Sequence, residues 1–157
     1  MHDGRPRRTG RRGPHKATEQ NLWRAALTYL RRTASSADNL ERVLMRRVER
    51  SARAHGTDRK QGAAAVSAIM RRLGRAGLID DRRYAEARAA ALVERGISTR
   101  GIRARLTAKG VAPEVIEQAL GALAGGADEA ELRAARGLAR RRRLGPYRLA
   151  GERARHR

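Results

Sequence analysis

The sequence contains no cysteine and no phenylalanine, and its aromatic residues are one Trp and three Tyr among 157 residues. Without cysteine, the chain forms no disulfide and offers no thiolate as a zinc ligand or a nucleophile. With so few aromatic rings, its cores must be built in small pieces from Leu, Ile, Val, Met and Ala. The longest uncharged runs, Gln61–Met70 and Gln118–Ala127, have ten residues each, whereas a membrane-spanning helix needs about 20. The basic start of the chain is followed by no apolar run, so we expect a soluble, cytoplasmic protein that does not enter membranes.

Acidic residues are scarce relative to basic ones. The chain has 37 Lys and Arg against 16 Asp and Glu, which gives a formal net charge of +21. Nearly all of the basic residues are Arg, whose planar guanidinium forms paired hydrogen bonds with phosphates and carboxylates. A general preference for Arg on solvated faces accounts for the choice of Arg over Lys, but not for the excess of charge. The excess favours a polyanionic partner, which is either a nucleic acid or an acidic protein surface.

Motifs for catalysis and cofactor binding are also absent. The chain has neither a phosphate-binding P-loop nor a dinucleotide-binding glycine motif. No pair of histidines has the spacing of metal ligands, since all four lie in expected loops and tails: His2, His15, His55 and His156. Asp80 and Asp81 are a carboxylate pair of the kind that binds Mg²⁺ or transfers protons, but consecutive helical residues point apart. We interpret them as residues of a helix N-terminus, and we predict no enzyme activity, no cofactor and no metal.

Apolar residues recur at helical spacing from Ala17 onward, which predicts three helices in the first part of the chain. Ser36 is placed to cap the second helix, the polar stretch 50–61 is expected to be a loop, and the third helix should end near Gly74 or Gly77. The apolar stripes of the three helices are Trp23, Ala26, Leu27 and Leu30; Leu40, Val43, Leu44 and Val48; and Ala65, Val66, Ile69, Met70 and Leu73.

Three further helices are marked by capping residues. Asp80 is a natural N-cap for the first, which ends at Gly96. Ser98 or Thr99 caps the next, and Gly110 ends it in a left-handed turn. Further markers are a hydrophobic-staple pair at Ile79 and Tyr84, and Pro113 in the first turn of the last helix.

The chain also contains an internal repeat. The pattern Leu30-x5-Ser36-x3-Leu40-x3-Leu44 recurs later in the chain as Leu92-x5-Ser98-x3-Ile102-x3-Leu106. Self-similarity at a fixed period is typical of repeat architectures. We therefore predict an all-α fold, an elongated array of tandem three-helix repeats. Its expected parts are a disordered basic tail at 1–17, repeats at 18–77 and 78–126, and a partial third repeat with a basic C-terminal tail at 127–157.

The third repeat is expected to contain one full helix. This helix begins near Asp128 and Glu129, and it breaks at Gly145-Pro146 after a run of arginines. Leu132, Ala135, Arg136 and Ala139 form one stripe along this predicted helix. The chain stops at Arg157, before a second and third helix of this repeat, so we expect an incomplete third repeat.

The amino-acid sequence of the second repeat resembles that of the RecX family. Residues Gly77-Leu78-Ile79-Asp80-Asp81-Arg82-Arg83-Tyr84-Ala85 are similar to the segment G-x-[LI]-D-D-x-x-[FY]-A of RecX proteins, and Ser98 and Gly110 match positions further on. The resemblance implies a bacterial regulator that binds the RecA recombinase and its nucleoprotein filament. It implies inhibition of the ATPase and strand exchange of RecA, and hence modulation of recombination and DNA repair. In the family, curved repeats lie in the groove of the filament.

Outward-facing arginines are the candidate partner-binding residues: Arg24, Arg31, Arg100, Arg103, Arg140, Arg141, Arg142 and Arg143. Any one of them could equally be part of an ordinary solvated helix face. The alternative function is an autonomous protein that binds single- or double-stranded DNA without sequence specificity. Sequence-specific readout is disfavoured, because the helix after Ser98 has arginines but no Asn or Gln. We expect a monomer.

Overall fold

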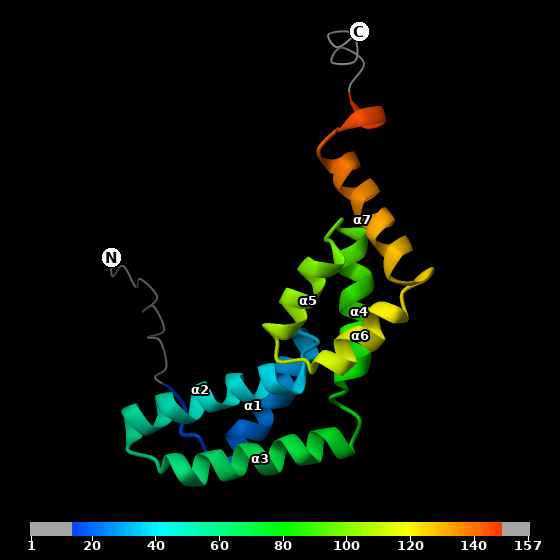
Figure 1. Cartoon of the computed structure of the whole chain (residues 1–157). Coiled ribbons are helices and arrows are strands. Elements are labelled where there is room, and N and C mark those ends of the chain that lie inside the picture. The colour runs from blue at the N-terminus through cyan, green and yellow to red at the C-terminus, as the bar shows by residue number, and fades with distance from the viewer. Residues whose placement is uncertain (1–13, 149–157) are drawn as a thin grey trace, which may run out of the picture.

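The computed structural model describes residues 14–148, and within this range the regular secondary structure is entirely helical (Figure 1). Seven α-helices and one short 3-10 helix follow one another: α1 (Glu19–Arg32), α2 (Ala37–His55), α3 (Arg59–Arg75), α4 (Asp81–Glu94), α5 (Thr99–Thr107), α6 (Pro113–Gly121), α7 (Gly126–Arg141) and η1 (Gly145–Tyr147). The prediction of an all-α fold is confirmed.

Helices α1, α2 and α3 enclose one small aliphatic core. Its largest fully buried side chains are Leu22, Leu40, Leu44, Val48, Val66 and Leu73. The predicted inner face of α1 is confirmed for Ala26, which is buried together with the unpredicted Leu22. The other predicted residues, Trp23, Leu27 and Leu30, are only half-buried and pack against this core. Trp23 instead lies at the edge of the core, where the Arg72 guanidinium stacks 4.1 Å from the centre of its ring. This cation–π contact covers one face of the indole ring at the edge of the core.

The loop predicted at 50–61 is much shorter in the structure. Helix α2 continues to His55, and only three residues separate it from α3. Burial explains the extension, since Ser51 and Ala52 are buried on the inner face of α2 despite the polar surroundings in sequence. The Ser51 hydroxyl accepts hydrogen bonds from Ala17 N and Thr57 Oγ1, both at 2.8 Å.

The hydrogen bond from Ala17 N to Ser51 Oγ also attaches the end of the N-terminal tail to α2. Residues 1–13 of the expected basic tail lie outside the described residues. Residues 14–17 run along α2, where His55 Nε2 also makes a hydrogen bond to the Pro14 carbonyl. The described part of the tail is therefore held by the first three helices rather than free of them.

A second core lies between α4, α5, α6 and the start of α7. It contains Leu92, Val93, Ile102, Leu106, Ile116 and Leu120, all nearly inaccessible to solvent. The staple pair is divided between the cores, since Ile79 packs against the first and Tyr84 against the second. The chain therefore passes from the first core to the second between Ile79 and the first turn of α4.

Helix α7 packs against the second core through small residues. Its buried residues are Ala130 and Ala134, whereas Leu132 and Ala135 are exposed, so the predicted stripe of this helix is wrong. The reason is a close backbone approach to α4. A Cβ atom placed on Gly96 would lie 2.7 Å from Leu138 N and 2.8 Å from Ala134 O. Only a face of small residues fits so near another backbone.

Capping groups recur at the period found in the sequence. Thr18 and Asp80 cap α1 and α4, and each side-chain oxygen accepts from the backbone N–H three residues later. Ser36 and Ser98 cap α2 and α5 in the same way. Both pairs are separated by the interval that relates the two copies of the sequence pattern. The positions at which helices begin therefore recur at the period of the sequence pattern. Each of these positions is set by a capping residue in the local sequence.

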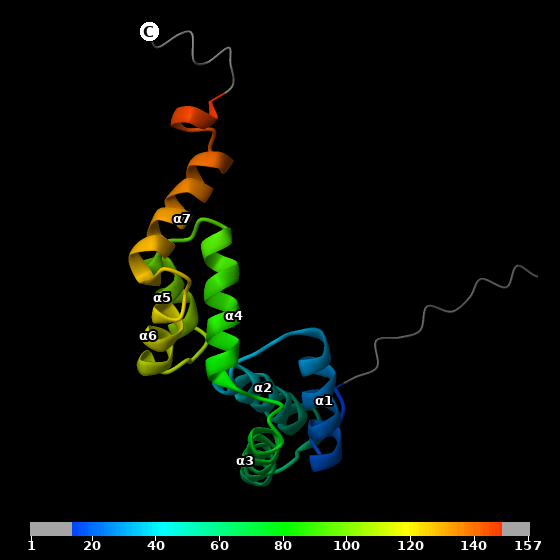
Figure 2. The same cartoon turned by 90° about the vertical axis from the view of Figure 1, so that its right-hand side faces the viewer.

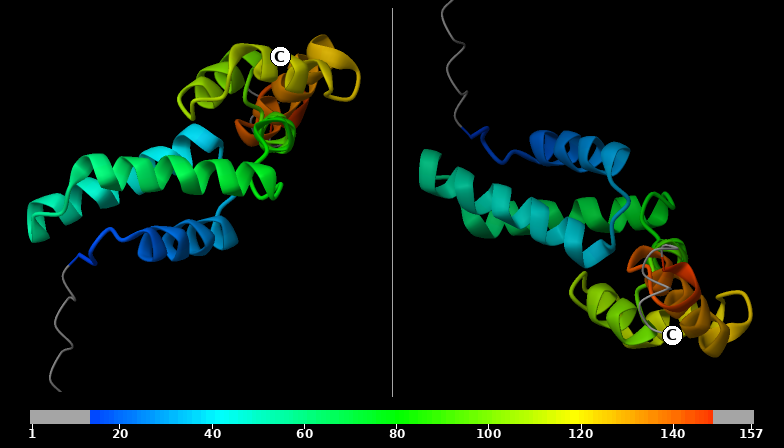
Figure 3. Two further views of the ribbon diagram at one scale, coloured as in Figure 1. Left: turned by 90° about the horizontal axis from the view of Figure 1, so that it is seen from below. Right: turned by 90° about the horizontal axis from the view of Figure 1, so that it is seen from above.

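The helices form an elongated, bent molecule. Figures 1 and 2 show α1–α3 grouped at one end, with α4 leading away from them and α7 continuing beyond α4–α6. In Figure 3, which views the molecule along a perpendicular direction, the two groups again lie apart and meet near the start of α4. The described basic residues are thus spread along a long body rather than over a compact one.

Candidate partner-binding surface

Arg24 belongs to a basic pocket in the first group of helices. Together with Lys16 and Arg47 it lines a cavity of about 320 Å³ between the start of α1 and α2, whose floor includes Leu22 and Ala25. Among the described residues, no carboxylate lines this cavity. Helix α1 supplies Arg24 on its exposed face, and α2 supplies Arg47. An open cavity with three unopposed cations attracts an anionic group such as a phosphate or a carboxylate.

Arg31 and Arg100 are exposed and stand apart from that pocket. Arg31 lies in the last turn of α1 and Arg100 in the first turn of α5. Among residues 14–148, neither takes part in an ion pair. Arg31 is favourably placed at the negative end of its helix, whereas Arg100 sits at a positive end, where a cation is disfavoured. Arg100 therefore occupies a position that does not stabilise its own helix.

Arg103 has a structural partner. Its Nε and Nη2 donate to the two carboxylate oxygens of Glu117 at 2.7 and 2.9 Å, which ties α5 to α6. These hydrogen bonds lower the pKa of Glu117 and raise the pKa of Arg103. A guanidinium engaged on two oxygens is less available to a partner than its exposure suggests. We therefore rank Arg103 below the other candidates.

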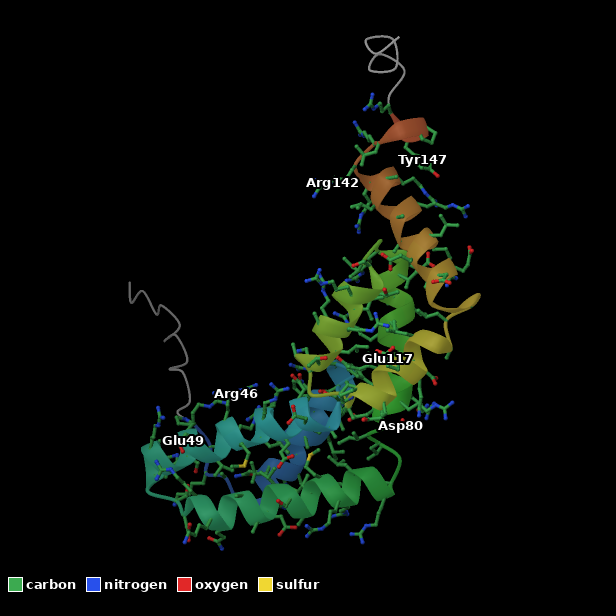
Figure 4. The ribbon with its side chains drawn as sticks, in the orientation of Figure 1. Arg46, Glu49, Asp80, Glu117, Arg142 and Tyr147 are labelled. Atoms are coloured by element: carbon green, nitrogen blue, oxygen red, sulfur yellow. The ribbon has the colours of Figure 1, made fainter. Side chains whose placement is uncertain are left out.

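Arg140–Arg143 lie at the end of α7, far from the pocket around Arg24. Arg140 and Arg141 line a second basic cavity with Arg133 and Arg136 of the same helix, and Glu94 is the one carboxylate among the described residues that line it. The Arg140 guanidinium also lies 5.8 Å from the centre of the Tyr147 ring. Figure 4 places Arg142 and Tyr147 at the opposite end of the molecule from Arg46 on α2. The candidate arginines therefore form separate clusters rather than one site.

Asp80 and Asp81 act as helix caps instead of forming a catalytic pair, and Asp81 links the two groups of helices. Asp80 Oδ1 accepts from Arg83 N at 3.0 Å and caps α4. Asp81 Oδ1 accepts from Ala37 N, the first residue of α2, at 2.7 Å. The second carboxylate therefore caps a helix that begins 44 residues earlier in the chain. A carboxylate at a helix N-terminus satisfies an otherwise unpaired N–H and the positive end of the helix.

The same arrangement occurs at the next junction. Glu131 of α7 accepts from Thr99 N, the first residue of α5, through Oε2 at 2.8 Å. Ala37 and Thr99 are equivalent positions of the repeat, since each directly follows the capping serine of its helix, Ser36 or Ser98. At each junction, a carboxylate from the following group of helices therefore caps the middle helix of the preceding one. The joint between neighbouring groups is polar and recurs along the chain.

Gly110 completes the first junction. It adopts a left-handed conformation with φ of 72°, and a Cβ atom there would overlap the side chain of Asp38. Next to it, the Lys109 carbonyl accepts from Ser36 Oγ, and the Ala108 carbonyl accepts from Arg42 Nη2 at 3.1 Å. The carbonyl groups of the turn after α5 therefore accept hydrogen bonds from side chains near the start of α2. This close contact requires glycine at position 110, because a side chain there would overlap Asp38.

Comparison with known proteins agrees with this architecture. Residues 80–120, from the cap of α4 to the last turns of α6, match the second three-helix domain of RecX. Over 139 residues the chain is 41% identical to the regulatory protein RecX of Myxococcus xanthus (strain DK1622), covering 88% of this chain and 73% of the relative. The chain belongs to the RecX family. That membership confirms the resemblance seen in the sequence, and it makes the chain a regulatory protein rather than an enzyme. No solved structure matches the chain.

Within the described range, the His, Asp and Glu side chains form no cluster of three that could hold a metal ion. No helix there is long and apolar enough to cross a membrane.

Sequence reasoning missed several residues of this RecX-family surface. Lys16 and Arg47 were not among the candidates, although they complete the pocket of Arg24. Glu131 was not singled out either, because its partner Thr99 lies 32 residues away in sequence. The repeat period does not point to Glu131 either, since the residue equivalent to Asp81 in the next repeat is Arg143.

Proposed function

We propose that this chain binds RecA and its nucleoprotein filament, inhibits the ATPase and strand exchange of RecA, and so modulates recombination and DNA repair. Family membership supports a regulatory role. The observation that carries the finer proposal is the presence of separate basic clusters, around Arg24 and around Arg140–Arg141, at distant points of an elongated body. Several modest contacts on one rigid body add as avidity on a polymer.

The proposed units are those predicted from the sequence: residues 18–77, 78–126 and a partial third unit at 127–157, following the tail at 1–17. The separate cores of α1–α3 and α4–α6 support this division. The proposed partner-binding residues are Arg24, Arg31, Arg100 and Arg140–Arg143, with Arg103 ranked last. We also propose that the chain works as a monomer in the cytoplasm.

The alternative is autonomous, non-specific DNA binding. One observation favours it: among the described residues, no carboxylate opposes Lys16, Arg24 and Arg47 in their pocket, as expected of a site for backbone phosphates. Binding of this kind weakens steeply with salt, because it depends on the release of counterions from DNA.

The salt dependence gives the test. DNA-dependent ATPase activity of RecA is measured with substoichiometric chain, at a salt concentration that abolishes the chain's own binding to DNA. Inhibition that persists supports a regulator that contacts RecA. Inhibition that disappears together with DNA affinity supports the alternative.

Charge-reversal variants localise the effect. Arg24→Glu/Arg47→Glu alters the pocket, and Arg71→Glu/Arg75→Glu makes the same change of charge on exposed positions of α3 outside it. The proposal expects the first pair to weaken inhibition clearly more than the second. Equal losses would show that only the overall charge matters.

A further inference from the structure

A groove lies at the joint between the first two groups of helices, apart from the basic clusters described above. It has a volume of about 670 Å³ and is lined by the end of α1, the segment between α3 and α4, and one face of α4. Its apolar lining includes the side chains of Tyr29, Leu30, Leu78, Tyr84, Ala87 and Ala91. The groove exists only because the two groups meet at this angle.

Leu78 is the most informative of these residues. It has 51% of its surface exposed, although it lies in an ordered segment whose backbone is fixed by a hydrogen bond from Leu78 N to Leu73 O at 3.0 Å. A large aliphatic side chain held in water costs free energy that a buried one does not. At this position it faces the same groove as the half-buried rings of Tyr29 and Tyr84.

The polar groups of the groove are organised on one side. Asn39 Nδ2 donates to Tyr29 Oη at 3.0 Å and to Ser35 Oγ at 2.8 Å, while Asn39 Oδ1 accepts from Lys109 Nζ at 3.3 Å. These bonds run between α1, α2 and the turn after α5. They hold the tyrosine and the lysine in place before anything binds, which lowers the ordering cost of binding.

The rim of the groove is positive. Arg83, Arg88 and Lys109 line it, and the one carboxylate among the described lining residues is that of Asp80, which already accepts from Arg83 N. Within residues 14–148, neither Arg83 nor Arg88 forms an ion pair. An apolar floor beneath unopposed cations complements a segment that combines apolar anchors with acidic side chains.

We propose that this groove docks an acidic segment of the partner protein, anchored by apolar side chains. The inference rests on the proposed function, because it assigns a surface to that partner. A protein segment fits better than a nucleic acid. The rings of Tyr29 and Tyr84 pack against the two cores, so they are not free to stack on bases. The partial burial of Tyr84 also raises the pKa of its hydroxyl group. The rest of the apolar lining is aliphatic, which suits side chains rather than bases.

Substitutions in the groove test the proposal through binding. The probe is RecA assembled on single-stranded DNA, and the variants are Leu78→Asp and Arg83→Glu/Arg88→Glu. All three positions are exposed, so both variants should melt as the unmodified chain does. We expect each to weaken binding about tenfold or more, whereas the control Arg71→Glu/Arg75→Glu changes it much less. If both groove variants bind and inhibit RecA as the unmodified chain does, the proposed docking role of the groove is contradicted. The proposed function would still stand in that case.

The absence of cysteine allows a direct second test. A benzophenone attached through Ala91→Cys lies in the groove, and one attached through Ala64→Cys lies on an exposed position of α3 outside it. We expect illumination to cross-link RecA from position 91 and not from position 64. Cross-links from position 91 to DNA or to a second copy of the chain would overturn the proposal. If the unmodified chain neither binds nor inhibits RecA, the proposed function fails and this inference fails with it.

Discussion

Single side chains at the joints carry more of the architecture than their exposure suggests. Asp81 and Glu131 each accept from the first amide of a helix in the preceding group, at 2.7 and 2.8 Å. The sequence predicts that Asp80 and Asp81 belong to a helix start, and Asp80 caps α4 as expected. It does not predict the partner of Asp81, because local capping rules cover only the next few residues.

Removing the Asp81 carboxylate should loosen the first joint. In Asp81→Ala, the Ala37 N–H loses its acceptor, and we expect the free energy of unfolding to fall by about 1 kcal/mol, as for other lost caps. Denaturant unfolding measures this loss. Glu131→Ala is the matched variant at the second joint and should behave alike, and full stability in both variants would contradict a structural role for these carboxylates.

Glu49 should make stability depend on pH. Hydrogen bonds from Arg59 and Arg53 lower its pKa from 4.5 to about 2. Because the folded pKa lies below the unfolded one, the stabilisation is fully present above pH 4.5 and is lost as the pH falls towards about 2. Melting temperatures measured across this range should fall less steeply in Glu49→Gln than in the unmodified chain. Identical slopes would show that the ion pairs of Glu49 with Arg53 and Arg59 contribute nothing to stability in solution.

At the scale of helices, sequence patterns predict their number and most of their starts, but not every inner face. Helix α7 presents Ala130 and Ala134 to the core and leaves Leu132 exposed. Hydrophobicity alone favours burying the leucine. The close approach of the turn after α4 to the α7 backbone, at Gly96 and Gly137, selects the alanines instead. Such an approach is a property of the packed structure.

Gly96 provides a test of how α7 is docked. Gly96→Ala adds left-handed strain and places a Cβ against the backbone of α7, whereas Gly77→Ala adds the strain in open space. We expect the control to lose about 1–2 kcal/mol and Gly96→Ala to lose clearly more. Hydrogen exchange of α7 amides should rise only in Gly96→Ala, and equal effects of the two changes would contradict the packing described.

Leu106 tests the second core. It is completely buried between α4, α5 and α6, and Leu106→Asp would place an unpaired charge there at a cost of several kcal/mol. We expect loss of the second group of helices, visible in circular dichroism as reduced helicity. Unchanged helicity and melting would place the core face elsewhere.

At the scale of the whole molecule, charge and shape act together. The net charge of +21 predicts a polyanionic partner, and the structure distributes the candidate arginines over distant parts of a bent, elongated body. The sequence period predicts the tandem arrangement. The bend could not be predicted, because it depends on polar contacts at the joint between groups that are far apart in sequence.

We propose that this body lies along a polymer of its partner and holds it through several spaced contacts. The most direct measurement compares the affinity of the chain for RecA filaments on DNA with its affinity for unassembled RecA, at one salt concentration that suppresses direct DNA binding. Avidity predicts that the filament is bound about 100-fold more tightly. Equal affinity for the two forms would contradict the account.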